Sequence, residues 1–283
     1  MFQHEMGKVD FLQPPTKIVV LDWVLTEHLL ALGVIPYGVA DADGYKNWVV
    51  EPALPDTVIN IGSRREPNLE LLEQMKPDLI LMSQAMSAAY DKLNSIAPTI
   101  VLSVYTDNHQ PLDAAKAQLR TLGKLLHRNE QAQRVIADVE QTITNNKEAL
   151  MAVNPPLPPL LFIRFIDDKH IRVHGRYSLA GETIHEMGLR NAWEKAGNTW
   201  GFSSSTIQQL APFQTVKAFY FGPLTDSEKA RIDKNPIWNV MGFVQQNNVY
   251  ELPPIWTFGG VKAAQRLSDM VTKQLLSAPE GHE

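Results

Sequence analysis

A long helical pattern without interruption, residues 129–153, constrains the fold of this chain more than any other feature. It contains no glycine or proline, and its apolar positions include Val135, Ile136, Val139, Ile143, Leu150 and Met151. At 1.5 Å per residue, the predicted helix is about 36 Å long. The run NPPLPP at residues 154–159 ends it, because proline marks a firm boundary. We therefore expect one long helix to separate two parts of the chain.

Short runs of β-branched residues alternate with helical stretches on both sides of this pattern. Before it, we expect strands at residues 18–21, 37–40, 58–61, 78–82 and 100–104, and helices at 26–32, 67–75, 87–96 and 111–126. After it, we expect strands at residues 160–166, 171–174, 218–221 and 249–252, and helices at 179–187, 225–232 and 260–276. Such alternation predicts parallel strands with crossover helices.

The expected fold class is therefore α/β, with two Rossmann-like lobes that have mainly parallel central sheets and are joined by one long α-helix. The expected domains are an N-terminal lobe at residues 16–127, the linking helix at 128–153 and a C-terminal lobe at 154–283. A ligand groove is expected between the lobes, because clefts between domains are favoured ligand sites.

The composition excludes several classes of protein. The chain has 283 residues and no cysteine, so disulfides, thiolate nucleophiles and cysteine-bound metals are ruled out. Its net charge of −5 provides no basic surplus for phosphates, so we expect no nucleic acid partner. No apolar run approaches the roughly 20 residues that cross a bilayer. The start, MFQHEMGKVDFLQPPTK, lacks the cationic and apolar segments of a signal peptide.

The common catalytic motifs are missing from the sequence. There is no G-x-G-x-x-G after a strand and no G-x-x-x-x-G-K-[ST], so a dinucleotide or NTP site has no support. GFSSST at residues 201–206 does not form a G-x-S-x-G elbow. His170 and His174 are four residues apart in a predicted strand, which places them about 13 Å apart, too far to share a metal. We predict no metal site made by the protein.

Two adjacent arginines, Arg64 and Arg65, end an apolar run and precede Pro67. Strand ends and the loops after them face the ligand crevice in open α/β sheets. Pro67 suits the first helical turn, and a helix N-terminus adds partial positive charge. This arrangement favours an anionic oxygen as ligand. The alternative is that both arginines are solvated or pair with Glu66 and Glu70.

Aromatic residues provide a second signal for a binding site. Trp48, Trp200 and Trp256 all fall in predicted loops, which suggests aromatic walls around a ligand. The alternative is that each tryptophan is a hydrophobic plug for its own loop. Arg164 stands in the middle of the apolar run Leu-Phe-Ile-Arg-Phe-Ile. It is either an edge-strand charge or a residue that faces the cleft.

The segments VLDWVLTEHLLALGVIPYGVAD, GYKNWVVEPALPDTVINIGSRREPNLELLEQMKPDLILMS, NAW, NTWG and LPPIWTFGG occur together in this chain. Over residues 18–276 the sequence resembles the bacterial periplasmic binding proteins for ferric hydroxamate siderophores. The resemblance implies two α/β lobes joined by a single helix, with the siderophore in a shallow groove between them. It also implies that the chain is the substrate-binding protein of an ABC importer for iron uptake and not an enzyme. Such a protein binds no cofactor directly, and its ligand is an Fe(III)-siderophore complex.

The resemblance assigns roles to particular residues. At G-x-R-x-E-P-N-L-E it assigns Arg64 to the hydroxamate oxygens around iron. Trp48, Trp200 and Trp256 match aromatic positions that line the groove, and Asn198 matches a nearby polar position. Six hydroxamate oxygens already fill the coordination shell of hard Fe(III), so the protein has to supply oxygen-binding donors and aromatic surface instead of metal ligands.

Three positions of the expected groove depart from the family pattern. Met86 stands where the family has a groove tyrosine, and Tyr90 or Tyr45 is expected to compensate for the lost hydroxyl. Phe258 replaces a second tyrosine. Arg164 stands where ferrichrome binders have a small polar residue, and an added cation would suit a siderophore with free carboxylates, of the aerobactin type. Ferrioxamine and ferrichrome remain the other candidate ligands.

The resemblance also implies a partner and a compartment. Glu70 matches an acidic residue that meets an arginine of the inner-membrane ABC permease. The matching position of the C-terminal lobe is Gln208, which is uncharged, so Glu194 or Asp226 is expected to serve instead. We expect a monomer in the periplasm of a Gram-negative bacterium, with its signal peptide removed.

Two other functions are considered. The first is binding of another bulky metal cofactor, a corrinoid or haem, and haem would need an axial histidine or tyrosine. The second is a chelatase-type enzyme, which would need a His/Glu pair at the cleft. Glu27 and His28 are the nearest candidates for such a pair, and we expect them on the surface of the first helix.

Overall fold

The computed structural model describes residues 2–11, 13–153 and 157–277. Part of the predicted boundary at residues 154–159 therefore lies outside the described residues. The Cα positions divide the chain into two compact units. The first unit comprises Met1–Val104, Leu112–Asp138 and Gly259–Ala263, and the second comprises Tyr105–Pro111, Val139–Phe258 and Ala264–Glu283. In the part of the chain that is described, no helix has both the length and the apolar character of a membrane span.

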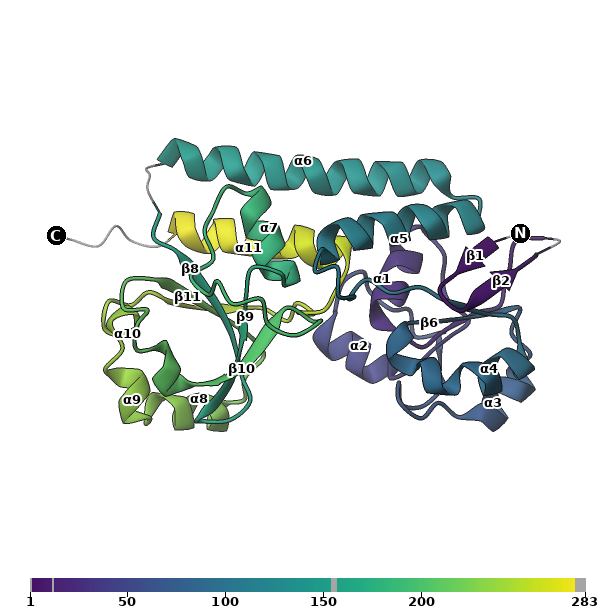
Figure 1. Cartoon of the computed structure of the whole chain (residues 1–283), viewed down its shortest axis with the longest axis horizontal. Coiled ribbons are helices and arrows are strands. Elements are labelled where there is room, and N and C mark those ends of the chain that lie inside the picture. The colour runs from purple at the N-terminus through teal and green to yellow at the C-terminus, as the bar shows by residue number, and fades with distance from the viewer. Residues whose placement is uncertain (1, 12, 154–156, 278–283) are drawn as a thin grey trace. The chain divides into compact units, whose positions relative to one another are not determined.

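Helix α6, Asn129–Val153, is the long helix that the sequence predicts, and Figure 1 draws it as one continuous helix. Its first residues belong to the first unit and its remainder to the second. The C-terminal helix α11, Val261–Ser277, is likewise shared by the two units. The chain therefore passes from the first unit to the second within α6, and again within α11.

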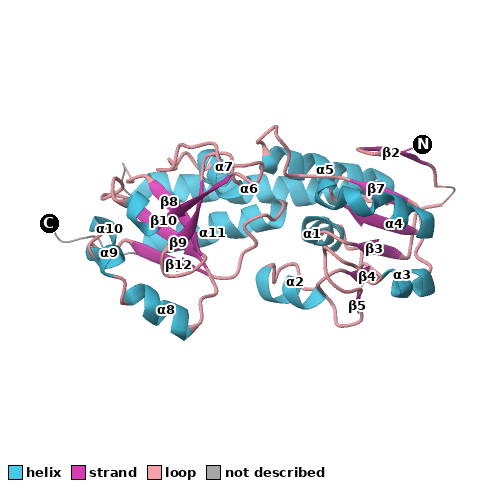
Figure 2. Ribbon diagram, turned by 60° about the horizontal axis from the view of Figure 1, so that its bottom comes forward, coloured by secondary structure: helices cyan, strands magenta, loops and turns pink. Residues whose placement is uncertain are grey.

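The first unit is built on a five-stranded sheet with the strand order β5-β4-β3-β6-β7. All neighbouring strands are parallel, as predicted. The strands are β3 (Ile18–Val20), β4 (Gly38–Val39), β5 (Ile59–Asn60), β6 (Leu79–Met82) and β7 (Thr99–Val101). Strands β3, β6 and β7 are buried along their whole length, which is typical of a parallel sheet covered on both faces. Figure 2 shows β7, β3, β4 and β5 following one another across this sheet.

Helices connect these strands, and side-chain caps fix where they begin. They are α1 (Trp23–Ala31), α2 (Ala42–Trp48), α3 (Leu69–Met75), α4 (Tyr90–Ile96), which follows the 3-10 helix η1 (Gln84–Ala89), and α5 (Pro111–Leu125). Asp22 caps α1, because its carboxylate accepts a hydrogen bond from the Val24 amide at 2.8 Å. Helix α1 ends before Gly33, whose φ of +73° suits the left-handed turn predicted there.

Two local predictions in this unit are wrong. Trp48 does not lie in a loop, since it is the last residue of α2. Pro67 does not occupy the first turn of α3, because Asn68 is the N-cap and accepts a hydrogen bond from the Leu71 amide at 3.0 Å. Pro67 instead forms an isolated bridge with Gly62, which closes the loop that carries Arg64. A hairpin of β1 (Phe2–His4) and β2 (Gly7–Val9) was not predicted.

The second unit contains a mixed sheet with the order β10-β9-β8-β11-β12. Its strands are β8 (Leu160–Phe165), β9 (His170–His174), β10 (Phe202–Thr206), β11 (Lys217–Phe221) and β12 (Val249–Leu252). Strands β8, β11 and β12 are parallel, whereas β9 and β10 run antiparallel to their neighbours. The short turn after β8 makes β9 antiparallel, because Asp167 accepts hydrogen bonds from the Lys169 and His170 amides. The serine-rich strand β10 was missed by the sequence analysis.

Short helices complete this unit together with α6 and α11. They are α7 (Leu179–Glu186), the 3-10 helix η2 (Ile207–Leu210), α8 (Asp226–Asp233), α9 (Pro236–Asn239) and α10 (Gly242–Gln245). Alternate residues of β8 and β9, such as Ile163 and Val173, pack with Trp193, Trp238 and Phe243 in one buried core. The opposite face of these two strands carries Arg164, Arg172 and His174.

Glu27 and His28 do not lie on the surface of the first helix, contrary to the prediction. Both are fully buried and hold the start of α11. The Glu27 carboxylate accepts hydrogen bonds from the Gly260 amide at 3.0 Å and the Lys262 amide at 2.8 Å, across 233 and 235 positions of sequence. The Val261 amide donates to Nε2 of His28 at 3.4 Å. A buried carboxylate thus satisfies amides at a helix N-terminus, where negative charge is favoured.

Close packing and burial give this contact two further properties. A Cβ atom at Gly260 would lie only 2.3 Å from Nε2 of His28, so glycine is required there. Burial lowers the pKa of His28 to about 4, so its imidazole is neutral at physiological pH and can accept a hydrogen bond.

We predict that Glu27→Gln destabilises the protein by about 1–3 kcal/mol, because a buried charge-assisted acceptor for two amides is weakened. The measurement is urea unfolding followed by circular dichroism. Glu73→Gln, on the exposed side of α3, is the matched control and should leave the free energy of unfolding within about 0.5 kcal/mol of the parent protein. Equal stability of the two variants would show that the Glu27 contact does not hold α11.

Candidate functional site

The Arg64 cluster, which we define as Arg64, Trp23, Asp22 and Asp41, lies at one edge of the first sheet. Its members follow the carboxyl ends of β3, β4 and β5, three adjacent parallel strands, which is why they meet there. The Arg64 guanidinium carbon lies 3.7 Å from the centroid of the Trp23 ring, and its Nε lies 3.6 Å from Oδ2 of Asp41. The cation is thus held by an aromatic face and by a carboxylate.

Local structure fixes each partner of Arg64. Trp23 is 2% exposed and donates from Nε1 to the Ala40 carbonyl at 3.2 Å. Asp41 is the N-cap of α2, with Oδ1 accepting from the Gly44 amide at 3.2 Å. The sequence analysis considered Glu66 and Glu70 as ion-pair partners of Arg64 and missed Asp41. Proximity in the sheet, and not in sequence, brings Asp41 to Arg64.

Arg64 is a partly desolvated cation. Its side chain is 36% exposed, and burial lowers its pKa, while the carboxylates of Asp22 and Asp41 act in the opposite direction. Arg65 is exposed, and its amide donates to Ser63 Oγ at 3.1 Å, so this neighbouring residue helps to form the turn. The two adjacent arginines therefore have different environments, and Arg64 alone belongs to the cluster.

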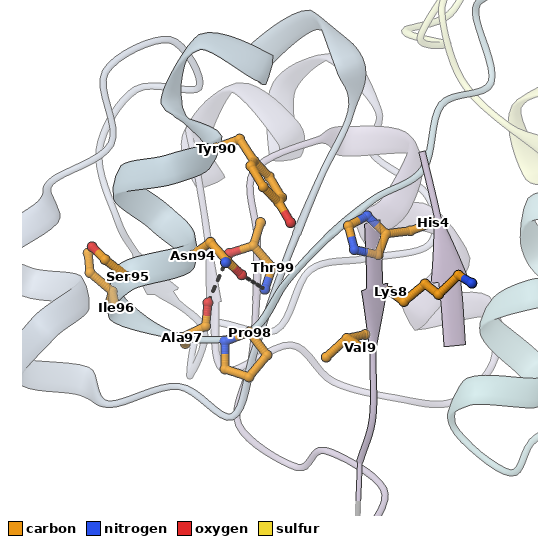
Figure 3. Close-up of a pocket in the computed structure, with 10 residues that line it drawn as sticks. All are labelled: His4, Lys8, Val9, Tyr90, Asn94, Ser95, Ile96, Ala97, Pro98 and Thr99. Atoms are coloured by element: carbon orange, nitrogen blue, oxygen red, sulfur yellow. Dashed lines mark hydrogen bonds between the residues drawn. The ribbon is translucent and has the colours of Figure 1, made fainter. Parts of the chain in front are cut away.

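The other predicted residues of this unit are dispersed. Trp48 ends α2 and is half-buried, and Met86 lies in η1 after β6, packed against the core of the unit. Tyr90 is on α4, with its ring 6.1 Å from that of His4. Figure 3 shows Tyr90 and His4 lining the same pocket, which has a volume of about 360 Å³. Tyr45, which was expected to offer a hydroxyl in place of one at Met86, is fully buried and donates to the Pro52 carbonyl.

The second unit gathers aromatic residues around Phe258. Four aromatic rings have centroids within 6 Å of the Phe258 ring: Tyr105 at 5.9 Å, Trp200 at 5.1 Å, Phe202 at 5.6 Å and Trp256 at 5.4 Å. We call these five residues the aromatic cluster. Phe258 is 8% exposed, whereas the other four are half-buried. Phe258 is thus the packing centre that supports the more accessible rings. Tyr105, stacked on Trp200 at 5.1 Å, was not predicted.

Asn198 holds the turn that presents Trp200. Its Oδ1 accepts hydrogen bonds from the Trp200 amide at 3.0 Å and the Phe202 amide at 3.3 Å. Thr199 donates from Oγ1 to Asp107 at 3.0 Å. Asn198 therefore orients Trp200 and Phe202 of the aromatic cluster through hydrogen bonds to their backbone amides.

Arg164 and Arg172 are directly opposite each other on β8 and β9. Arg164 lies 6.0 Å from the Trp256 ring, and Arg172 lies 4.7 Å from the Phe202 ring. Burial, and secondarily the charge of Arg172, lowers the pKa of Arg164. His174 is fully buried on the same face, and burial followed by the two arginine charges lowers its pKa to about 3. The positive charge here comes from the two arginines, since His174 is neutral.

No group of three or more histidine, aspartate or glutamate side chains within residues 2–11, 13–153 and 157–277 is arranged to hold a metal ion. His170 pairs with Asp167, with Nδ1 at 2.8 Å from Oδ2, on the exposed turn after β8. The two clusters instead offer guanidinium donors and aromatic surface. Such groups bind a ligand by hydrogen bonding and contact with its carbon skeleton.

Two α/β units share a long helix; one carries a guanidinium cluster at the carboxyl edge of its sheet, and the other carries a cluster of half-buried aromatic rings. This combination is typical of a helix-linked substrate-binding protein. The sequence model described as "Periplasmic binding protein" matches residues 18–255, so the chain belongs to the periplasmic binding protein family. Members of this family that resemble the chain are binding proteins and not enzymes.

Three relatives illustrate the match. The iron(3+)-hydroxamate-binding protein FhuD of Escherichia coli K12 is 36% identical over 250 residues, which cover 88% of this chain and 83% of that protein. The probable siderophore-binding lipoprotein YfiY of Bacillus subtilis is 27% identical, covering 97% of this chain and 87% of the relative. The structure of FhuD from Vibrio cholerae with bound Fe3+-Desferal has a TM-score of 0.88 and 29% identity, covering 93% of this chain and 99% of the other.

Proposed function

We propose that this chain is the substrate-binding protein of an ABC importer and captures Fe(III)-hydroxamate siderophores for iron uptake. The observation that carries the proposal is the Arg64 cluster, in which a partly desolvated guanidinium is oriented by Trp23 and Asp41 at the carboxyl edge of a parallel sheet. Relatives that bind iron(3+)-hydroxamate and Fe3+-Desferal support the same class of ligand.

The ligand chemistry matches the residues of both units. Hydroxamate oxygens that coordinate Fe(III) carry negative charge, and a guanidinium can donate a forked pair of hydrogen bonds to them. Arginine has five N–H donors, so Arg64 can contact Asp41 and a ligand oxygen together. The half-buried rings of the aromatic cluster suit the apolar carbon linkers of a siderophore. Iron itself needs no protein ligand, because the oxygens of the siderophore fill its coordination shell.

We propose particular ligand contacts in each unit. In the first unit they are Arg64, Trp48, Met86 and Tyr90. In the second unit they are Trp200, Trp256, Phe258, Asn198 and Arg164, with Phe258 and Asn198 acting mainly by positioning Trp200. The candidate ligands are ferric siderophores of the aerobactin, ferrioxamine and ferrichrome types.

A titration followed by tryptophan fluorescence tests this function. Ferrioxamine B, ferric aerobactin, ferrichrome and cobalamin are added separately, with correction for their absorbance. We predict saturable quenching by at least one hydroxamate at micromolar concentration or below. Arg64→Ala should weaken that binding by about 10–100-fold, because charge-assisted hydrogen bonds are lost.

Arg65→Ala is the matched control for this titration, because Arg65 is exposed and adjacent in sequence. It should change the dissociation constant by less than about threefold. Absence of quenching by every hydroxamate would contradict the proposed function, and quenching by cobalamin alone would favour a corrinoid binder. Equal losses in the two variants would remove Arg64 from the binding site.

We propose that Glu70 docks the protein on its permease. Glu70 is exposed in the first turn of α3, where a carboxylate is favourable near the helix N-terminus and remains accessible to a partner. Gln208, at the corresponding place of the second unit, lies in η2 and is uncharged. We further propose that the protein acts as a monomer in the periplasm of a Gram-negative bacterium after removal of an export signal, which sedimentation and cell fractionation would check.

We predict that Glu70→Lys reduces siderophore uptake through the cognate importer by at least about tenfold, because a repulsive charge replaces an attractive one. Siderophore binding in solution should not change. Glu73→Lys, on the same helix, is the control and should retain uptake. Full uptake by the Glu70 variant would exclude this residue from docking.

A further inference from the structure

Arg164 and Arg172 form a cross-strand pair of like charges, which we call the arginine pair. The register places Arg164 of β8 opposite Arg172 of β9, and their side chains project from the same face of the sheet. Directly opposed residues have Cβ atoms about 4.5–5.5 Å apart, and like charges in such positions are destabilising. An arrangement that costs stability points to a role outside the fold.

The described part of the chain supplies little compensation for the charge of Arg172. Both arginines are half-buried, and within the described residues Arg172 forms no ion pair and no side-chain hydrogen bond. Asp167, the acidic residue nearest in sequence after β8, is engaged by the His170 side chain and by two amides. On the other side of β9, Ser204 is opposite Arg172 and is exposed. No carboxylate of the neighbouring strands neutralises Arg172.

Two aromatic rings orient the pair. The Phe202 ring faces the Arg172 guanidinium at 4.7 Å, and the Trp256 ring faces that of Arg164 at 6.0 Å. A guanidinium that stacks on a ring keeps its N–H groups in its own plane, where they can donate to a planar anion. Both rings also belong to the aromatic cluster, so the arginine pair adjoins the residues proposed to contact the siderophore.

We infer that the arginine pair is a two-cation subsite for free carboxylates of the siderophore, and that it makes the protein select carboxylate-bearing hydroxamates over uncharged trihydroxamates. This inference rests on the proposed function and names the ligand class within it. A carboxylate bound across both guanidinium groups relieves their mutual repulsion and gains charge-assisted, forked hydrogen bonds. An uncharged ligand leaves the repulsion in place.

The test compares two ligands and three variants. The ligands are ferric aerobactin, which carries free carboxylates, and ferrioxamine E, an uncharged cyclic trihydroxamate. Arg172→Gln and Arg164→Gln are each expected to weaken ferric aerobactin about 10–100-fold and to change ferrioxamine E less than about threefold. Arg172→Lys, which keeps the charge but loses the fork, should weaken ferric aerobactin less than Arg172→Gln does.

Arg176→Gln is the control, because Arg176 is exposed in the same unit and contacts Tyr177 instead of the aromatic cluster. It should leave both affinities unchanged. Circular dichroism confirms that each variant is folded before titration. Equal losses for the two ligands, or no loss for ferric aerobactin, would overturn the inference while leaving the proposed function intact. If the parent protein binds neither ligand, the inference fails, and the proposed function fails as well only if ferrichrome and ferrioxamine B are not bound either.

Discussion

The buried carboxylate of Glu27 determines how this chain closes on itself. It brings residues Gly259–Ala263, from near the end of the chain, into the unit formed by the beginning of the chain. Helix α11 consequently begins in the first unit and continues in the second, as α6 does. The segment that carries Trp256 and Phe258 leads directly into this anchored helix start. A buried side chain that accepts hydrogen bonds from two amides thus fixes the place where the segment with Trp256 and Phe258 ends.

The Arg64 cluster and the arginine pair hold their cations in the same way. In each, an aromatic face holds a guanidinium that is only partly solvated: Trp23 under Arg64, and Phe202 beside Arg172. Partial burial strengthens the interaction of such a cation with an anion, because the surrounding dielectric is lower than that of water. Arg64 has a nearby carboxylate in Asp41, whereas the arginine pair is a concentration of like charge. The first arrangement suits iron-bound oxygens, and the second suits a carboxylate group.

Local sequence patterns were sufficient to predict most of the fold. The apolar periodicity and the lack of glycine and proline defined α6, and β-branched runs located the strands of the first sheet. The antiparallel strand β10 was missed because FSSST has the composition of a loop, and its pairing with β9 depends on a distant segment. Trp48 was misplaced because the cap of α2 comes from Asp41 in a left-handed conformation, with φ of 54°.

The candidate site was predictable only in part, because several of its contacts join residues that are far apart in the sequence. Arg64 could be distinguished from Arg65 by its resemblance to a family motif, but its partner Asp41 follows a different strand. Arg172 and Tyr105 carry no distinctive local signal, and their importance comes from the register of β8 with β9 and from stacking on Trp200. Glu27 and His28 were expected on a surface because helical spacing alone does not reveal the helix start that covers them.

A crystal structure of the protein with bound ferrioxamine is the most direct test of the central claim. The account predicts a nitrogen of the Arg64 guanidinium about 3 Å from an iron-bound hydroxamate oxygen, and rings of the aromatic cluster against the carbon linkers. It also predicts that all six iron ligands come from the siderophore. A siderophore bound away from Arg64, or an iron atom ligated by a protein side chain, would contradict it.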